Sequence, residues 1–247
     1  MNKLLHYEIR KSGGTKLILL GITAVLELVF LAGILFNKDN VIGLGAILLF
    51  VAALGGIFFI GIQSVTILHR DMNTRQGYML FMTPNSSYRI LGAKVLENGL
   101  SLLLAGAFFA VLGFLDITLM MAHYGQLEQL WQTVNRVLTN IYPEFSLHWD
   151  TILAVLFAFL CSWLSTVVAA YLADVVATAL LKGKKFGGFL AFVLFILIQL
   201  VIGWVQFRIR IPGNTVAYFL AEAALDLGFA VLMYCATAVI MERKLSI

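Results

Sequence analysis

Six long apolar stretches, separated by short polar segments, constrain this chain more than any other feature of its sequence. Each is long enough for a helix, rising 1.5 Å per residue, to cross the roughly 30 Å hydrocarbon core of a bilayer. Backbone groups in lipid must be satisfied internally, so the expected fold is all-α with six transmembrane helices. The expected spans are residues 17–36, 41–68, 93–121, 151–181, 186–207 and 214–241.

The composition agrees with an integral membrane protein. Of the 247 residues, 61% are hydrophobic and 12% are charged, whereas a soluble domain carries about 25% charged residues. A soluble chain this apolar would expose large sticky patches. Its three prolines lie outside the expected spans, so the helices are expected to be unbroken. We therefore expect a single transmembrane domain over residues 1–247.

The distribution of basic residues predicts the orientation of the spans. Lysine and arginine are enriched in short cytoplasmic loops of membrane proteins. With both ends of the chain inside the cell, only Lys38, Arg136, Arg208 and Arg210 of the 17 basic residues would lie outside. We therefore expect a multi-pass protein of the cell membrane with both ends in the cytoplasm. This topology and contact with the lipid bilayer explain the net charge of +4 without a nucleic-acid partner.

Three segments are expected outside the hydrocarbon core, and two of them have an amphipathic pattern. Residues 1–15 mix apolar and basic side chains and then reach Gly13-Gly14, which predicts an interfacial helix with a joint before the first span. Residues 122–150 place apolar side chains at i, i+3, i+4 and i+7, which predicts an outer amphipathic helix ending near Pro143. That outer helix either packs at the membrane interface or serves as a lid.

The third segment, residues 69–94, is a polar island between the second and third spans. From Asp71 onward it reads DMNTRQGYMLFMTPNSSYRILGAK. A short helix is expected over about 73–82, followed by a turn at TPNSS. The polar residues of this turn suit the N-cap of a helix that begins near Tyr88 and continues into the third span. A basic, structured loop of this kind is suited to binding a soluble partner on the cytoplasmic side.

The order of residues in the island is similar to that in the cytoplasmic loop of bacterial ABC-2 type permeases. In that family a glycine, a leucine-rich run before a proline, a small polar turn, and an isoleucine four residues before a lysine follow one another. The matching positions here are Gly77, Met79-Leu80, Pro84, Asn85-Ser86-Ser87, Ile90 and Lys94. The segment YEIRKS before the first span, the six spans and the chain length are also similar.

The resemblance implies the transmembrane permease subunit of an ATP-binding cassette exporter. Such a chain pairs with a second permease chain, as a homodimer or a heterodimer, and with two separate ATPase subunits. The island's turn would be the coupling helix, which moves the spans when ATP closes the ATPases. The implied ATPase-coupling residues are Arg75, Gly77, Pro84, Asn85, Ser86, Ser87, Tyr88, Arg89 and Lys94. Positive-inside topology alone would explain the basic residues among them equally well.

One departure from the family concerns the outer segment between the fifth and sixth spans. Family members often carry short re-entrant helices there, but here only residues 207–215 separate the two spans. A re-entrant part is therefore either contained in the long sixth span or absent.

No catalytic chemistry is expected on this chain, and we predict that it is not an enzyme. It lacks a G-x-x-x-x-G-K-[ST] phosphate loop, so ATP and Mg²⁺ are expected on the partner subunit and no cofactor on this chain. The histidines fall at span ends or in loops, so no span offers an H-E-x-x-H metal site or a catalytic base. Cys161 and Cys235 fall inside spans and are expected to be packing residues.

Five acidic residues fall inside the expected spans, where a charge costs about 3 kcal/mol or more. They are Glu27, Asp116, Asp174, Glu222 and Asp226. One explanation is a polar translocation path that favours a cationic or amphipathic substrate. The other is that these carboxyl groups are protonated, bonded between helices, or near water at the membrane boundary.

Two further functions remain open from the sequence. An ion-coupled secondary transporter would use the membrane acids as proton sites, and it predicts internal repeats and interrupted helices. A non-transporting sensor or scaffold subunit would share the loop but not depend on the acids.

Glycines in the second and third spans are expected to let helices approach closely. They are Gly43, Gly45, Gly55, Gly56, Gly61, Gly106 and Gly113.

Overall fold

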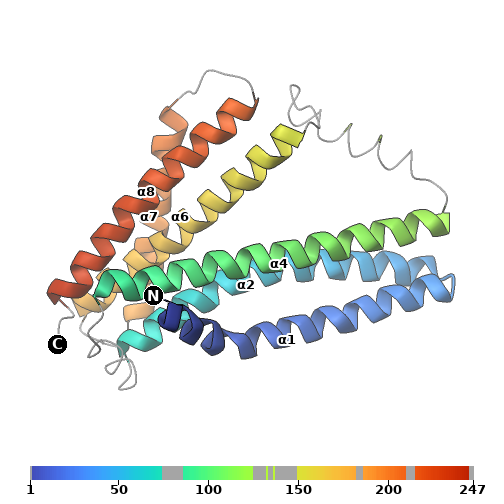
Figure 1. Cartoon of the computed structure of the whole chain (residues 1–247), viewed down its shortest axis with the longest axis horizontal. Coiled ribbons are helices and arrows are strands. Elements are labelled where there is room, and N and C mark those ends of the chain that lie inside the picture. The colour runs from blue at the N-terminus through green and yellow to red at the C-terminus, as the bar shows by residue number, and fades with distance from the viewer. Residues whose placement is uncertain are drawn as a thin grey trace. The chain divides into compact units, whose positions relative to one another are not determined.

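The computed structural model describes residues 2–73, 86–124, 132, 136, 149–181, 186–209 and 215–244. The elements in these ranges are α1 (Asn2–Leu35), α2 (Asp39–Asn73), α4 (Ser87–Tyr124), α6 (Trp149–Leu181), α7 (Gly187–Arg208) and α8 (Thr215–Lys244) (Figure 1). All six helices are long and apolar enough to cross a membrane. The prediction of an all-α chain with six spanning helices is confirmed.

The first helix differs from the expectation at its N-terminal end. Instead of a separate helix over residues 1–15, α1 runs without interruption through Gly13 and Gly14. Figure 1 shows that α1 bends in this part but does not break. The reason is tertiary, because Glu8 and Ser12 lie one turn apart and both are buried. Packing of this face holds the first turns of α1 in helical form despite the two glycines.

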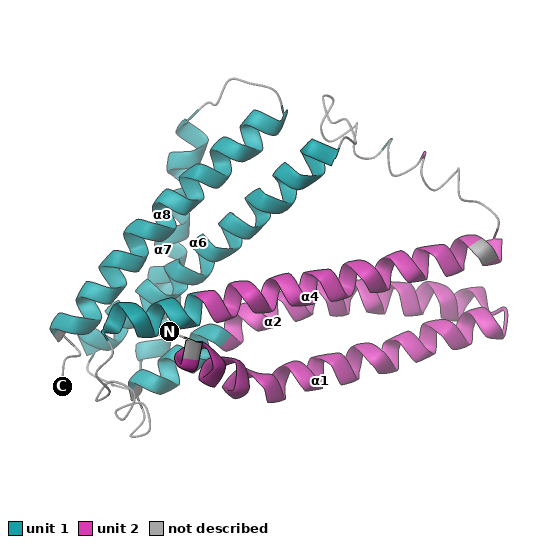
Figure 2. Cartoon of the chain, viewed as in Figure 1, with its two compact units in different colours: residues 1, 64–95, 134–247 teal, residues 2–63, 96–133 magenta. Residues whose placement is uncertain are grey.

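The chain forms two compact units, coloured teal and magenta in Figure 2. Unit 1 comprises α6, α7 and α8 together with residues 64–95, which include the ends of α2 and α4 next to the island. Unit 2 comprises α1, α2 up to Gln63, and α4 from Leu96 onward. We call residues 64–73 of α2 and 87–95 of α4 the loop feet, and from here on the island means residues 74–85, between the two feet. The loop feet therefore belong to the same unit as α6 and α8.

The centre of unit 1 is α6, which packs against both α7 and α8. Within the most apolar window of α6, 39% of the residues are buried, against 6% in α7. One core joins α6 to the loop feet and to α8, and its members are Leu68, Leu91, Val167, Tyr171, Val175, Ala238 and Met241. The apolar side chains that α7 leaves exposed suit contact with lipid or with another chain.

In unit 2, α1 and α2 are joined by a tight turn. Asn37 has a φ of 50°, the left-handed conformation that asparagine tolerates better than most residues. The N–H of Lys38 donates to the carbonyl of Gly33 at 3.0 Å, and the N–H of Asn37 donates to Ile34 at 3.2 Å. These two bonds form a Schellman motif, which ends α1 and reverses the chain direction.

Two glycines then allow close approach of α1 and α2. A Cβ added at Gly45 would lie 2.9 Å from the Cα of Phe30, and one at Gly33 would lie 2.9 Å from the N of Ile42. Gly56 lies similarly close to Leu19 and Phe109. The packing prediction is wrong for four of the expected glycines, since a Cβ there would meet no described atom within 4 Å. They are Gly43, Gly55, Gly106 and Gly113.

Also in unit 2, a hydrogen bond connects the end of α4 to the start of α2. The hydroxyl of Tyr124 donates to Oδ1 of Asp39 at 2.5 Å. This hydrogen bond raises the pKa of Tyr124, because losing the proton would break the bond beside a carboxylate. The pair is exposed, so its contribution to stability is small.

The expectations for the connecting segments have mixed outcomes. The helix expected over 73–82 and nearly all of the outer helix expected in 122–150 lie outside the described residues. The sixth span is one continuous helix, α8. It therefore does not contain the re-entrant segment considered for this part of the chain.

Candidate functional site

The implied ATPase-coupling residues divide into two groups. Arg75, Gly77, Pro84 and Asn85 lie outside the described residues, and the other five lie at the start of α4. The carbonyl of Ser86 accepts the first hydrogen bonds of this helix, from Arg89 N–H at 2.9 Å and from Ile90 N–H at 3.2 Å. Ser86 is therefore the N-cap residue, as the polar turn predicted.

The first turn of α4 presents one side outward and holds the other against α8. Ser86 and Arg89 are exposed, whereas Ser87 and Tyr88 are half-buried. The hydroxyl of Tyr234 donates to the carbonyl of Tyr88 at 2.5 Å. The two tyrosine rings also meet edge to face, with 6.2 Å between centroids. The turn next to the island is thus fixed to α8, while Arg89 is accessible to a partner.

Lys94 differs from the other coupling residues because it is buried. Its side chain is 2% exposed, and its Nζ lies 2.7 Å from Oδ2 of Asp71, which is 5% exposed. Fully buried lysines are rare and are nearly always paired. In this position Lys94 does not reach a partner's surface. It connects the two loop feet across the island instead.

Two further polar contacts connect the α2 foot to α6. The hydroxyls of Ser64 and Tyr171 are hydrogen-bonded to each other. One turn further along each helix, Nδ1 of His69 lies 2.7 Å from Oδ1 of Asp174. Asp174, which the sequence suggested for the translocation path, is therefore part of the packing between α2 and α6.

A second acidic contact lies elsewhere in unit 1. Asp226 of α8 is 3% exposed and accepts hydrogen bonds from Gln206 of α7, at 2.8 Å, and from Ser162 of α6. Ser162 precedes Asp174 by twelve residues on α6, or about 18 Å along the helix. The contact at Asp226 is therefore separate from the contact at Asp174. Glu222 lies one turn before Asp226 and is half-buried.

The remaining two acids meet in unit 2. The carboxyl groups of Glu27 on α1 and Asp116 on α4 lie close to each other. One oxygen of each group is buried without a hydrogen-bond partner among the described residues. The five acids thus fall into three groups, and Asp174 and Asp226 are hydrogen-bonded between helices.

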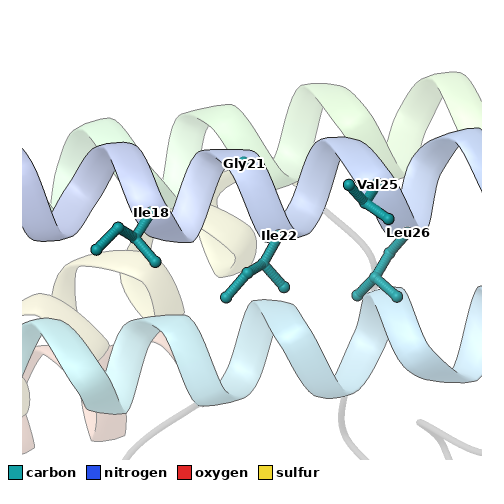
Figure 3. A pocket seen from close by; sticks show the side chains of 5 residues that line it. All are labelled: Ile18, Gly21, Ile22, Val25 and Leu26. Atoms are coloured by element: carbon teal, nitrogen blue, oxygen red, sulfur yellow. The ribbon is translucent and has the colours of Figure 1, made fainter.

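One hollow is lined by α1 alone and does not contain these acids. It has a volume of about 400 Å³ and is open and apolar. Figure 3 shows its lining residues, Ile18, Gly21, Ile22, Val25 and Leu26. An open apolar surface on a single spanning helix suits lipid chains, and it offers no polar group to recognise a substrate.

The contacts of Asp226 lead to a prediction about whether its charge or its hydrogen bonds matter for stability. Asp226→Asn keeps an acceptor for Gln206 and is expected to change the free energy of unfolding by less than about 0.5 kcal/mol. Asp226→Leu removes the acceptor and is expected to destabilise the protein by about 1 kcal/mol. Unfolding of the detergent-solubilised variants in increasing SDS measures both effects. Equal destabilisation by Asn and Leu would show that the charge, and not the hydrogen bond, matters.

A polar stripe on α4 was not predicted from the sequence. Lys94, Glu97, Asn98 and Ser101 are all buried, and their spacing of i, i+3, i+4 and i+7 places them on one helix face. Oε1 of Glu97 accepts hydrogen bonds from Ser12 at 2.7 Å, Lys16 at 2.5 Å and Ser101 at 2.9 Å. The helical spacing of four polar residues within an apolar run was the signal that could have revealed this stripe.

The candidate site is thus the pair of loop feet, with Ser86 and Arg89 exposed next to the island. Polar contacts within unit 1 join these feet to each other, to α6 and to α8. No family model, no curated protein and no solved structure matches this chain.

Proposed function

We propose that this chain is the transmembrane permease subunit of an ATP-binding cassette exporter of the ABC-2 type. It pairs with a second permease chain and receives the energy of ATP hydrolysis from separate ATPase subunits. The island between α2 and α4 is its docking loop. The observation that carries the proposal is that both loop feet are packed and hydrogen-bonded into the same unit as α6 and α8.

This arrangement is suited to transmitting a displacement of the island to the spanning helices. A partner that displaces the island acts on the feet, and the feet pack against Val167, Tyr171 and Val175 of α6. Close-packed interiors transmit displacement because side chains have few alternative positions. Movement of the island would therefore reach spanning helices that lie far from it in the sequence.

The test is co-purification with candidate ATPase subunits, for which the gene adjacent to that of this chain is the first source. Arg89→Glu is expected to reduce complex formation about tenfold or more, because an exposed positive charge next to the island is reversed. Arg10→Glu is the matched control, since Arg10 is also an exposed arginine on the expected cytoplasmic side. The control is expected to bind as the unmodified chain does.

Three results would count against the proposal. Equal loss in Arg10→Glu and Arg89→Glu would show a general charge effect. Unchanged binding and unchanged ATPase rate in Arg89→Glu would remove this turn from the interface. Failure of the folded chain to bind any ATPase subunit would favour the ion-coupled transporter or the scaffold instead.

A further inference from the structure

The buried pair of Asp71 and Lys94 joins the two helices that enter and leave the island. Asp71 lies near the end of α2 and Lys94 lies two turns into α4. Their charged groups meet at 2.7 Å with almost no exposure to solvent. The pair therefore ties α2 and α4 together next to the island.

Stability alone is a weak reason for such a pair. Replacing a buried ion pair by apolar residues of similar volume is often neutral or stabilising, because burying two charges is costly. A buried ion pair can instead fix the position of the two helices that carry it. Its attraction depends on a short distance between two charged groups, whereas apolar side chains pack acceptably in several registers.

The neighbours of the pair connect this position to the rest of unit 1. Leu91, one turn before Lys94, and Leu68, one turn before Asp71, both belong to the core with α6 and α8. Tyr88, two turns before Lys94, is bonded to Tyr234 of α8. Both feet therefore pack against α6 and α8 close to the pair.

We propose that Asp71 and Lys94 are positioning residues, which hold the two loop feet in one register so that the feet move as one body. The coupling consequence rests on the proposed permease function. The register itself does not, so the two parts can be tested separately.

The register is tested with spin labels on either side of the island. Arg70→Cys and Ser86→Cys are suitable because both side chains are exposed, in a background of Cys161→Ala and Cys235→Ala that removes the native thiols. Distance distributions are measured by pulsed electron paramagnetic resonance in the full chain in lipid nanodiscs. We expect one narrow distance in the unmodified pair and in Asp71→Glu, which keeps the charge.

The decisive variant is the double replacement Asp71→Leu with Lys94→Met, which removes both charges and leaves neither partner unpaired. We expect a folded protein with a broadened or shifted distance distribution. The matched control is Lys16→Met with Glu97→Leu, which removes a partly buried pair that does not flank the island. It is expected to leave the distance distribution between residues 70 and 86 unchanged.

The outcomes test the positioning role and the coupling consequence separately. An unchanged narrow distance in Asp71→Leu with Lys94→Met, or equal broadening in the Lys16 and Glu97 control, would overturn the positioning role. With an ATPase partner, we expect the double variant to bind but to lose about fivefold or more of the coupled ATPase stimulation. Broadening together with unchanged stimulation would overturn the coupling consequence. If the unmodified chain binds no ATPase, the permease proposal fails, while the distance measurement still decides the positioning role.

Discussion

Replacing Glu97 by alanine is expected to destabilise the protein by about 3 kcal/mol or more, the largest effect of any single change considered outside the loop feet. One carboxylate oxygen of Glu97 accepts bonds from Ser12, Lys16 and Ser101, and the residue is 6% exposed. Its removal leaves the buried hydroxyl of Ser12 and the ammonium group of Lys16 without this acceptor. The free energy of unfolding in increasing SDS, followed by circular dichroism, measures the loss.

Two controls define what the Glu97 result means. Glu97→Gln keeps an acceptor oxygen but loses the charge, so it is expected to cost less than the alanine variant. Asp39→Ala removes the exposed partner of Tyr124, and it is expected to cost little, because water screens an exposed pair. If Glu97→Ala is no more destabilising than Asp39→Ala, the buried stripe does not hold α1 to α4.

Replacing Gly45 by alanine is expected to destabilise the protein by about 1–3 kcal/mol. The added methyl group would lie 2.9 Å from the Cα of Phe30, which is backbone and cannot rotate away. The helices α1 and α2 must then separate, and Phe30, which is fully buried, loses its packing against this face. Thermal unfolding of the unmodified protein and of Gly45→Ala in detergent measures the loss of stability.

Gly43→Ala is the matched control for Gly45→Ala. Gly43 lies on the same helix two residues earlier, with no described atom within 4 Å of the added methyl group. Alanine favours a helix over glycine by up to about 1 kcal/mol, so this variant is expected to be neutral or more stable. Equal behaviour of Gly43→Ala and Gly45→Ala would contradict the close approach of α1 and α2.

Much of the local structure of the candidate site followed from the sequence. The polar turn predicted a capped helix starting near Tyr88, and α4 begins at Ser87 with Ser86 as its N-cap. A cap is a local feature, since it depends on a polar residue followed by helical residues a few positions away. The same local reasoning could not separate exposed Arg89 from buried Lys94, because both are basic residues of one helix.

The partners of the buried polar residues required the tertiary structure. Asp174 pairs with His69 across 105 positions of the chain, and Glu97 pairs with Lys16 across 81. From the sequence, the membrane acids had two explanations, and Lys94 was grouped with residues expected to contact a partner. Only the packing of the helices shows which polar faces turn toward each other.

The sequence by itself determined the number of spanning helices and their approximate limits. An apolar segment of this length can satisfy its backbone hydrogen bonds in lipid by forming a helix that crosses the bilayer. The tertiary structure decided how long each helix continues beyond its apolar stretch, which glycines meet a neighbour, and which charges are paired. Hydrophobicity is a property of each segment alone, whereas close approach and ion pairing depend on pairs of segments. The division of α2 and α4 between two compact units belongs to this second class.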